Sequence, residues 1–232
     1  MLFSIYMSDT PGKLLIDPAE FSSRLSGIKA FLFDWDGVFN NGEKNIDGHS
    51  VYSETDSMGI NMMRFHYHLQ KKYMPVCAVI SGEHNRLSYK WAQRENLHAV
   101  YAGIKHQEVA LDDICKKYHL QSEEVLFVYD DVLDLSLAAK AGLRFLVHHA
   151  GNPAFESFCM HHKLADYITQ QEGGQHAVRE ISEVVMQYSG DYDLTIQHRM
   201  NYSNEYLEFL KERNAIDTPF LTYQDGSIQP HS

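Results

Sequence analysis

The sequence predicts an α/β fold with three layers, in which helices cover both faces of a mostly parallel sheet. Short, continuously apolar runs recur along the chain, and this pattern is typical of parallel strands that are buried on both faces. Stretches with the apolar spacing of amphipathic helices lie between these runs. Repeated alternation of strand and helix favours right-handed crossovers, and therefore a Rossmann-like core. The length of 232 residues fits one such domain with short extensions.

The expected elements follow one another in order along the chain. The apolar runs expected to form strands are residues 28–33, 75–80, 99–101, 125–129, 145–148 and 167–169. The segments with helical spacing are residues 60–69, 109–118 and 177–185. A further short helix is expected over residues 204–213, followed by an irregular end from residue 224 onward.

The segment after the first strand departs from this alternation. Asp47-Gly48 is a type I′ turn signal between polar and β-prone residues, which predicts a β-hairpin that projects from the sheet over residues 38–56. The pattern divides the chain into an N-terminal extension, an α/β domain and an aromatic-rich C-terminal extension, at residues 1–27, 28–189 and 190–232.

Composition limits the classes of partner. The chain has 20 Lys and Arg against 31 Asp and Glu, and its net charge of −11 would repel a nucleic-acid backbone. No apolar run approaches the roughly 20 residues of a membrane span, and the first residues are too polar for a signal sequence. Cys77, Cys115 and Cys159 lie far apart without metal-like spacing. We therefore expect a cytoplasmic protein with reduced thiols and neither nucleic-acid nor membrane partners.

Two carboxylates, Asp34 and Asp36, follow the first predicted strand, and Gly37 comes directly after them. The carboxyl ends of strands are where open α/β sheets bind their ligands. Such a pair can divide the work of phosphoryl transfer, because one carboxylate attacks phosphorus while the other donates a proton to the leaving oxygen. The pattern alone fits a strand that ends in a polar loop equally well.

Polar residues also follow two other predicted strands. Asp130, Asp131 and Asp134 provide hard oxygen ligands of the kind that Mg²⁺ prefers. Asp131 and Asp134 also fit the start of a helix, as an N-cap or a first-turn acid. Ser81 and Gly82 at a further strand end can hold phosphate oxygens through a hydroxyl and backbone N–H groups, although Ser-Gly turns are common.

In this order the three sites resemble the haloacid dehalogenase superfamily of phosphotransferases, whose motifs are DxD, a strand-end Ser or Thr, a lysine and a paired acid. More narrowly, the chain resembles the capless subclass typified by the 3-deoxy-D-manno-octulosonate 8-phosphate (KDO 8-phosphate) phosphatases. That match rests on DGVFNNG, the hairpin around Asp47-Gly48, TDSMGI from Thr55, and GGQHAVRE from Gly173. It covers about residues 28–185 and implies that no large cap domain is present.

The resemblance implies a phosphatase that acts on a small sugar phosphate. Asp34 would be the nucleophile that forms an aspartyl-phosphate, and Asp36 the acid and base. Ser81 and the Gly82 amide would hold the transferring phosphoryl group. KDO 8-phosphate is the first expected substrate, and a nine-carbon keto-sugar acid 9-phosphate is the second.

The resemblance also implies a magnesium site and an oligomer. Mg²⁺ would be bound by Asp34, the backbone carbonyl of Asp36 and the side chain of Asp130, with Asp131 and Asp134 in support. In the family the hairpin helps to build a tetramer, and the glycine-rich segment near the end reaches a neighbouring active site. A homotetramer would therefore take the place of the cap.

Three residues depart from the family pattern. Gln107 stands where the family has a lysine, and the nearest cation is Lys105, which would have to reach the phosphate from a loop. Loss of a preorganised cation can cost about 3–4 kcal/mol of transition-state stabilisation. Glu83 stands where an arginine is frequent, and Tyr129 replaces a glycine and is expected to add bulk near the metal. The alternative is therefore a catalytically impaired protein that keeps the fold for binding or regulation.

Overall fold

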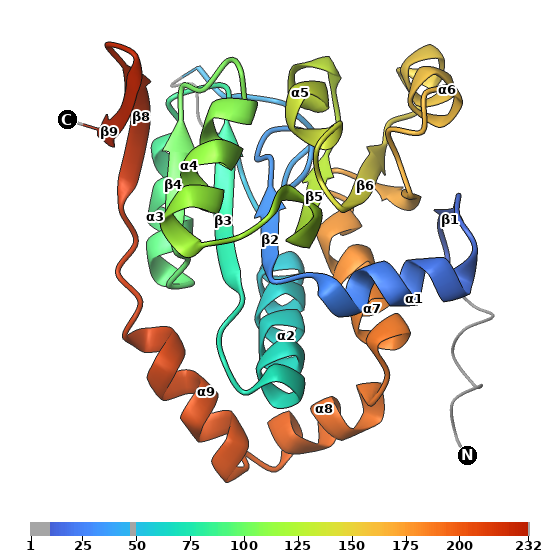
Figure 1. Cartoon of the computed structure of the whole chain (residues 1–232), viewed down its shortest axis with the longest axis vertical. Coiled ribbons are helices and arrows are strands. Elements are labelled where there is room, and N and C mark those ends of the chain that lie inside the picture. The colour runs from blue at the N-terminus through green and yellow to red at the C-terminus, as the bar shows by residue number, and fades with distance from the viewer. Residues whose placement is uncertain (1–9, 47–49, 232) are drawn as a thin grey trace.

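The computed structural model describes residues 10–46 and 50–231. It confirms the predicted α/β class, with nine strands in one mostly parallel sheet (Figure 1). All sheet neighbours are parallel except at the two edges, where the first and last strands pair in antiparallel fashion. The spatial order is β1 (Lys13–Leu14), β7 (Tyr167–Glu172), β6 (Leu143–His148), β5 (Val125–Tyr129), β2 (Ala30–Phe33), β3 (Val76–Ser81), β4 (Ala99–Ala102), β8 (Phe220–Gln224) and β9 (Ser227–Pro230).

Helices cover both faces of the sheet, as the sequence predicts. The side chains of Phe31 and Phe33 in β2 join one apolar core, and those of Ala30 and Leu32 join the other, because successive residues of a strand face opposite sides. The first core is covered by α1 (Pro18–Gly27), α2 (Glu54–Lys71), α3 (Arg86–Arg94) and α7 (Ala177–Ser189). The second is covered by α4 (Glu108–Tyr118), α5 (Leu135–Ala138) and α6 (Pro153–His161). Two 3₁₀ turns flank β5, η1 (Ser122–Glu124) and η2 (Val132–Asp134).

The hairpin predicted over residues 38–56 is not present as paired strands in the described part of that segment. Residues 38–46 form turns and bends, and α2 already begins at Glu54. Asn40 supplies the physical reason, because its side chain donates to the carbonyl oxygen of Trp35 at 3.2 Å and accepts from the N–H of Gly42 at 2.8 Å. These bonds fold the loop back over the end of β2. The Asp47-Gly48 turn lies outside the described residues.

The C-terminal end forms an antiparallel hairpin, so the expectation of an irregular end from residue 224 is wrong. Asp225 and Gly226 both adopt positive φ, at 52° and 80°, as the two central residues of a type I′ turn require. The ring of Phe220 stacks on Tyr89 of α3, with 4.5 Å between ring centroids. The hairpin therefore extends the sheet beyond β4.

Two helices connect α7 to this hairpin, α8 (Tyr192–Met200) and α9 (Asn204–Asn214). The second agrees with the predicted helix at residues 204–213. Both pack against α2 (Figure 1). Phe209 and Tyr206 of α9 enclose a small apolar core with Phe65 and Met62 of α2. The burial of these aromatic rings fixes the extension to the α/β domain.

The described cysteines carry free thiols, which agrees with the prediction from their spacing. Cys77 and Cys159 are buried, and Cys115 is half-buried. Within residues 10–46 and 50–231, no helix combines the length and the apolarity that a membrane crossing needs.

We expect Phe209→Ala to lower the free energy of unfolding by about 3–5 kcal/mol, because it removes a fully buried ring from this core. Leu207→Ala is the matched control, because Leu207 lies on the same helix with 46% of its surface exposed. Urea unfolding followed by circular dichroism measures both. Equal losses in the two variants would contradict the packing of α9 described here.

Candidate active site

Three carboxyl groups meet at the carboxyl ends of β2 and β5. Asp34 follows β2, and Asp130 and Asp134 follow β5. Because these two strands are parallel neighbours, their ends lie at the same edge of the sheet. One carboxylate oxygen from each of the three residues lies within 4.8 Å of the other two. Asp34 and Asp134 are buried, with 6% and 1% of their surface exposed.

Backbone hydrogen bonds hold the two acids that follow Asp130 in place. The carboxylate of Asp134 accepts from the N–H groups of Asp130 and Asp131, at 3.3 and 3.1 Å. Asp131 instead accepts from the N–H of Val132 at 2.7 Å and caps η2. Both acids lie at the start of η2, Asp131 as its N-cap and Asp134 in its first turn, and Asp134 also belongs to the carboxylate cluster.

Gly37 allows the close approach of Asp130. Its φ is 84°, and a Cβ placed there would lie 1.9 Å from Oδ2 of Asp130. The same oxygen lies 3.1 Å from Nε2 of His149, at the end of β6. A glycine at this position is therefore required by both backbone conformation and space.

Gln107, at the position expected for the family lysine, is fully buried. Its Nε2 donates to Oδ1 of Asp134 at 2.5 Å and to Oδ1 of Asp34 at 3.4 Å. Its Oε1 is buried and has no hydrogen-bond partner among the described residues. The side chain thus reaches the carboxylates as a lysine would, but it brings no charge.

Lys105 forms an ion pair with Glu83, and both side chains are largely exposed, at 66% and 58%. The ammonium group lies 3.9 Å from the point where a Cβ on Gly82 would stand. It therefore stands beside the phosphate-binding loop, and it is not among the described residues that line the cavity at the carboxylates.

Lys44 is a cation of the site that sequence reasoning missed. Its Nζ lies 3.0 Å from Oδ2 of Asp36, and the two side chains are 33% and 22% exposed. The segment that carries Lys44 was expected to project away from the sheet as a hairpin. Only the folded-back loop brings the residue to the site, so no local sequence signal could have found it.

Ser81 and Gly82 lie at the end of β3, across the cavity from this loop. Ser81 is buried, and its Oγ accepts from the N–H of Glu83 at 3.2 Å, which leaves the hydroxyl proton free for a ligand. A side chain on Gly82 would meet Leu133, because the added Cβ would lie 2.4 Å from its Cδ2. These residues line a cavity of about 480 Å³ together with Asp34 and Asp36.

Tyr129 does not crowd the site, contrary to the expectation. Its side chain lies in the core on the opposite side of the chain from Asp130, where it stacks on Phe127 with 5.7 Å between centroids. The hydroxyl donates to the carbonyl oxygen of Leu164 at 2.8 Å. The alternation of side chains along β5 explains this, because Tyr129 and Asp130 are successive residues and successive side chains point to opposite faces.

The electrostatics of the cluster are dominated by burial and by repulsion between carboxylates. Burial raises the pKa of Asp34 well above its usual range, and the charges of Asp134 and Asp130 raise it further. Burial and the neighbouring Asp130 raise the pKa of Asp134 to about 7. Burial also raises the pKa of Asp130, against the opposing hydrogen bond from His149. That hydrogen bond raises the pKa of the imidazole.

The donor set fits a magnesium ion. Three carboxylates with hard oxygen atoms, two buried and one half-buried, lie close enough to share one ion, and burial together with repulsion from neighbouring carboxylates raises their pKa values. A divalent cation would relieve this repulsion, and Mg²⁺ is usually held by a few carboxylates together with water.

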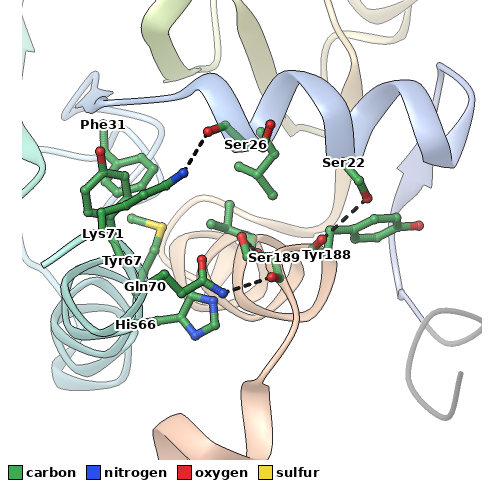
Figure 2. A pocket seen from close by; sticks show the side chains of 12 residues that line it. Ser22, Ser26, Phe31, His66, Tyr67, Gln70, Lys71, Tyr188 and Ser189 are labelled. Atoms are coloured by element: carbon green, nitrogen blue, oxygen red, sulfur yellow. Dashed lines mark hydrogen bonds between the residues drawn. The ribbon is translucent and has the colours of Figure 1, made fainter. Parts of the chain in front are cut away.

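A second, smaller cavity of about 110 Å³ lies between α1, α2 and α7 (Figure 2). Its polar groups hold the helices together: Lys71 donates to the carbonyl oxygen of Ser26 at 3.0 Å, and Gln70 to that of Ser189 at 2.9 Å (Figure 2). The side chains that line it include no carboxylate. The cavity at the ends of β2, β3 and β5 is therefore the candidate active site.

Comparisons with known proteins agree with this assignment. No protein-family model matches the chain. The KDO 8-phosphate phosphatase KdsC of Haemophilus influenzae is 27% identical over 171 residues, which is 72% of this chain and 87% of that protein. A YrbI family phosphatase from Pseudomonas syringae has a solved structure that matches with a TM-score of 0.65 and 25% identity, over 78% of this chain and 98% of the other.

The chain resembles the haloacid dehalogenase superfamily and, within it, the KDO 8-phosphate phosphatases. The fold is also that of the KDO 8-phosphate phosphatase from Moraxella catarrhalis, whose structure holds a magnesium ion, a phosphate ion and KDO. That structure matches with a TM-score of 0.63 and 22% identity, over 78% of this chain and 98% of the other. The carboxylate cluster therefore lies in a fold shared with named phosphatases, and the structure of one of them holds a magnesium ion.

We expect the metal-free protein to lose stability as the pH rises from about 4 to about 7. Carboxyl groups in the unfolded chain ionise near pH 4, whereas the folded pKa of Asp134 is about 7 and that of Asp34 is also raised. In this window the folded state binds more protons than the unfolded state, so the free energy of unfolding falls with rising pH.

Asp34→Asn tests this directly by removing one of the repelling charges. In the presence of a chelator near pH 8, we expect the variant to be more stable than the original protein by about 1–3 kcal/mol, with a smaller difference near pH 5. Asp193→Asn, at an exposed position on α8, is the control. Equal stability of the original and Asp34→Asn proteins near pH 8 in urea unfolding would contradict the repulsion.

Proposed function

We propose that this protein is a Mg²⁺-dependent phosphomonoester hydrolase that acts on a small sugar phosphate through an aspartyl-phosphate. The observation that carries the proposal is that Asp34 and Asp36 line one cavity together with Asp130 and Asp134. Nucleophile, acid, metal ligands and phosphate-binding loop thereby share one site, as phosphoryl transfer requires.

In the first step Asp34 attacks the phosphorus atom, and the bond from phosphorus to the sugar oxygen breaks. Asp36, in its acid form, gives its proton to that oxygen, so the sugar leaves as an alcohol. In the second step Asp36 takes a proton from water, whose oxygen attacks phosphorus and releases phosphate. The Asp34 carboxylate is thereby regenerated.

The phosphoryl group is held by the end of β3. The Ser81 hydroxyl and the Gly82 amide face the cavity and can donate to phosphoryl oxygens. The residues proposed to hold Mg²⁺ are Asp34, the backbone carbonyl of Asp36, and Asp130, with Asp134 in the same cluster. When bound, the ion supplies positive charge to the carboxylates and to the phosphoryl oxygens.

The cavity volume and the relatives support a small phosphorylated sugar as substrate. About 480 Å³ is in the range of small-molecule sites. KDO 8-phosphate is the first candidate, because it is the substrate in the names of the relatives. A nine-carbon keto-sugar acid 9-phosphate is the second.

We also propose, from the same resemblance, a homotetramer in the cytoplasm. The glycine-rich segment that begins at Gly173 packs against the loop after β2 of the same chain. A Cβ on Gly173 would lie only 1.9 Å from the carbonyl oxygen of Gly37 in that loop. Light scattering of the purified protein measures the oligomer, and a monomeric mass would refute the tetramer.

The function is tested by phosphate release from a panel of sugar phosphates with saturating Mg²⁺. We expect turnover of at least one keto-sugar acid phosphate, a loss of about 10³-fold or more in Asp34→Asn, and full activity in the exposed Asp193→Asn control. Release that is unchanged in Asp34→Asn, or absent from the whole panel, would overturn the proposal. Binding of phosphate without turnover would support the impaired binding protein that the neutral Gln107 suggests.

A further inference from the structure

The active-site cavity has a large excess of negative charge. The acidic residues that line it are Asp34, Asp36, Glu83, Asp130, Asp131 and Asp134. A phosphate monoester adds about two negative charges, and one divalent ion balances only part of this total. Catalysis of phosphoryl transfer depends on preorganised positive charge at the transferring group. A protein cation must therefore supplement the metal.

Neither Gln107, at the position expected for the family lysine, nor the nearby Lys105 provides this cation. Gln107 is buried and neutral, and its amide nitrogen donates hydrogen bonds to Asp34 and Asp134. Lys105 forms an ion pair with Glu83, and that ion pair is exposed beside the cavity. Among the described residues that line the cavity, only Lys44 and His149 can carry positive charge.

His149 is already paired with Asp130. Its Nε2 lies 3.1 Å from Oδ2 of that residue, at the inner end of the site. Its ring is 20% exposed. An imidazole held there balances a metal ligand, and it cannot leave Asp130 for the phosphoryl group without leaving that carboxylate unpaired.

Lys44 has a different position. It lies at the mouth of the cavity, paired with Asp36, the residue beside which the leaving oxygen must stand. One third of its side chain is exposed. Its flexible stem of four carbons allows the ammonium to move from Asp36 onto a bound anion without any change in the backbone.

The loop that carries Lys44 is anchored at its start. The side chain of Asn40 bonds to the backbone of Trp35 and Gly42. Gly173 packs on the same loop, since an added Cβ would lie 2.5 Å from the carbonyl oxygen of Asn40. These contacts hold the loop over the cavity, and the anchored start of the loop places Lys44 beside the cavity.

We propose that Lys44 is the phosphate-binding cation of this site, and that it takes over the charge that Gln107 lacks. The inference rests on the proposed phosphatase function. It predicts that positive charge at position 44, or at position 107, is needed for binding and turnover of the phosphoryl group.

Four variants test the inference: Lys44→Gln, Lys44→Arg, Lys105→Gln and the double variant Lys44→Gln with Gln107→Lys. Lys29→Gln is the matched control, because Lys29 is also ion-paired but lies before β2, at the opposite edge of the sheet. The readouts are kcat/KM for the best sugar phosphate and the Kd of inorganic orthovanadate in the presence of Mg²⁺. The second readout does not depend on turnover, and thermal unfolding confirms that each variant is folded.

We expect Lys44→Gln to lower kcat/KM by about 10²-fold or more and to weaken orthovanadate binding at least about tenfold. Lys44→Arg should keep activity within about tenfold of the original. The double variant should regain at least about tenfold over Lys44→Gln, because a buried lysine at position 107 would restore the charge. Lys29→Gln should match the original protein.

Two results would overturn the inference. One is a Lys44→Gln variant that turns over substrate and binds orthovanadate as the original protein does. The other is a Lys105→Gln loss as large as that of Lys44→Gln, which would assign the charge to the other lysine. If no sugar phosphate is hydrolysed, the proposed function fails, yet orthovanadate binding still decides whether Lys44 holds a phosphate-like anion.

Discussion

The crowding of three carboxylates, two of them buried, is the constraint on which the site depends. The parallel pairing of β2 and β5 brings Asp34, Asp130 and Asp134 to one sheet edge. Among the described residues, Asp34 and Asp134 meet no positively charged side chain, only backbone N–H groups and the neutral amide of Gln107. Such an arrangement is costly unless a cation is bound, and this cost is what makes the cluster a metal site rather than a polar patch.

The surrounding fold supports the cluster at close range. Gly37 leaves room for Asp130, the backbone after β5 donates to Asp134, and the loop from residue 38 folds back over the cavity with Lys44. Lys44 is thereby brought beside Asp36 from a loop, whereas the buried side chain that contacts Asp34 and Asp134 is the neutral Gln107.

The strands and the carboxylates that follow them could be predicted because both are local signals: continuous apolarity marks a buried strand, and its end marks the ligand edge. Two segments differ from the prediction. Asp225-Gly226 forms a type I′ turn where an irregular end is expected, although Asp-Gly is itself a signal for that turn. Over residues 38–46 the side-chain bonds of Asn40 hold the loop in turns and bends instead of an extended hairpin arm. The approach of Lys44 to Asp36 could not be predicted, because it depends on the path of that loop and not on any spacing in the sequence.

We infer that one metal ion and Lys44 together balance the carboxylates and a phosphoryl group at Asp34. A crystal structure of the protein with Mg²⁺ and beryllium trifluoride, a mimic of the phosphoryl group, would test this balance. We expect the mimic on Asp34, the ion between Asp34 and Asp130, and the Lys44 ammonium within hydrogen-bond reach of the mimic. A mimic bound away from Asp34, or one contacted by Lys105 while Lys44 stays on Asp36, would contradict it.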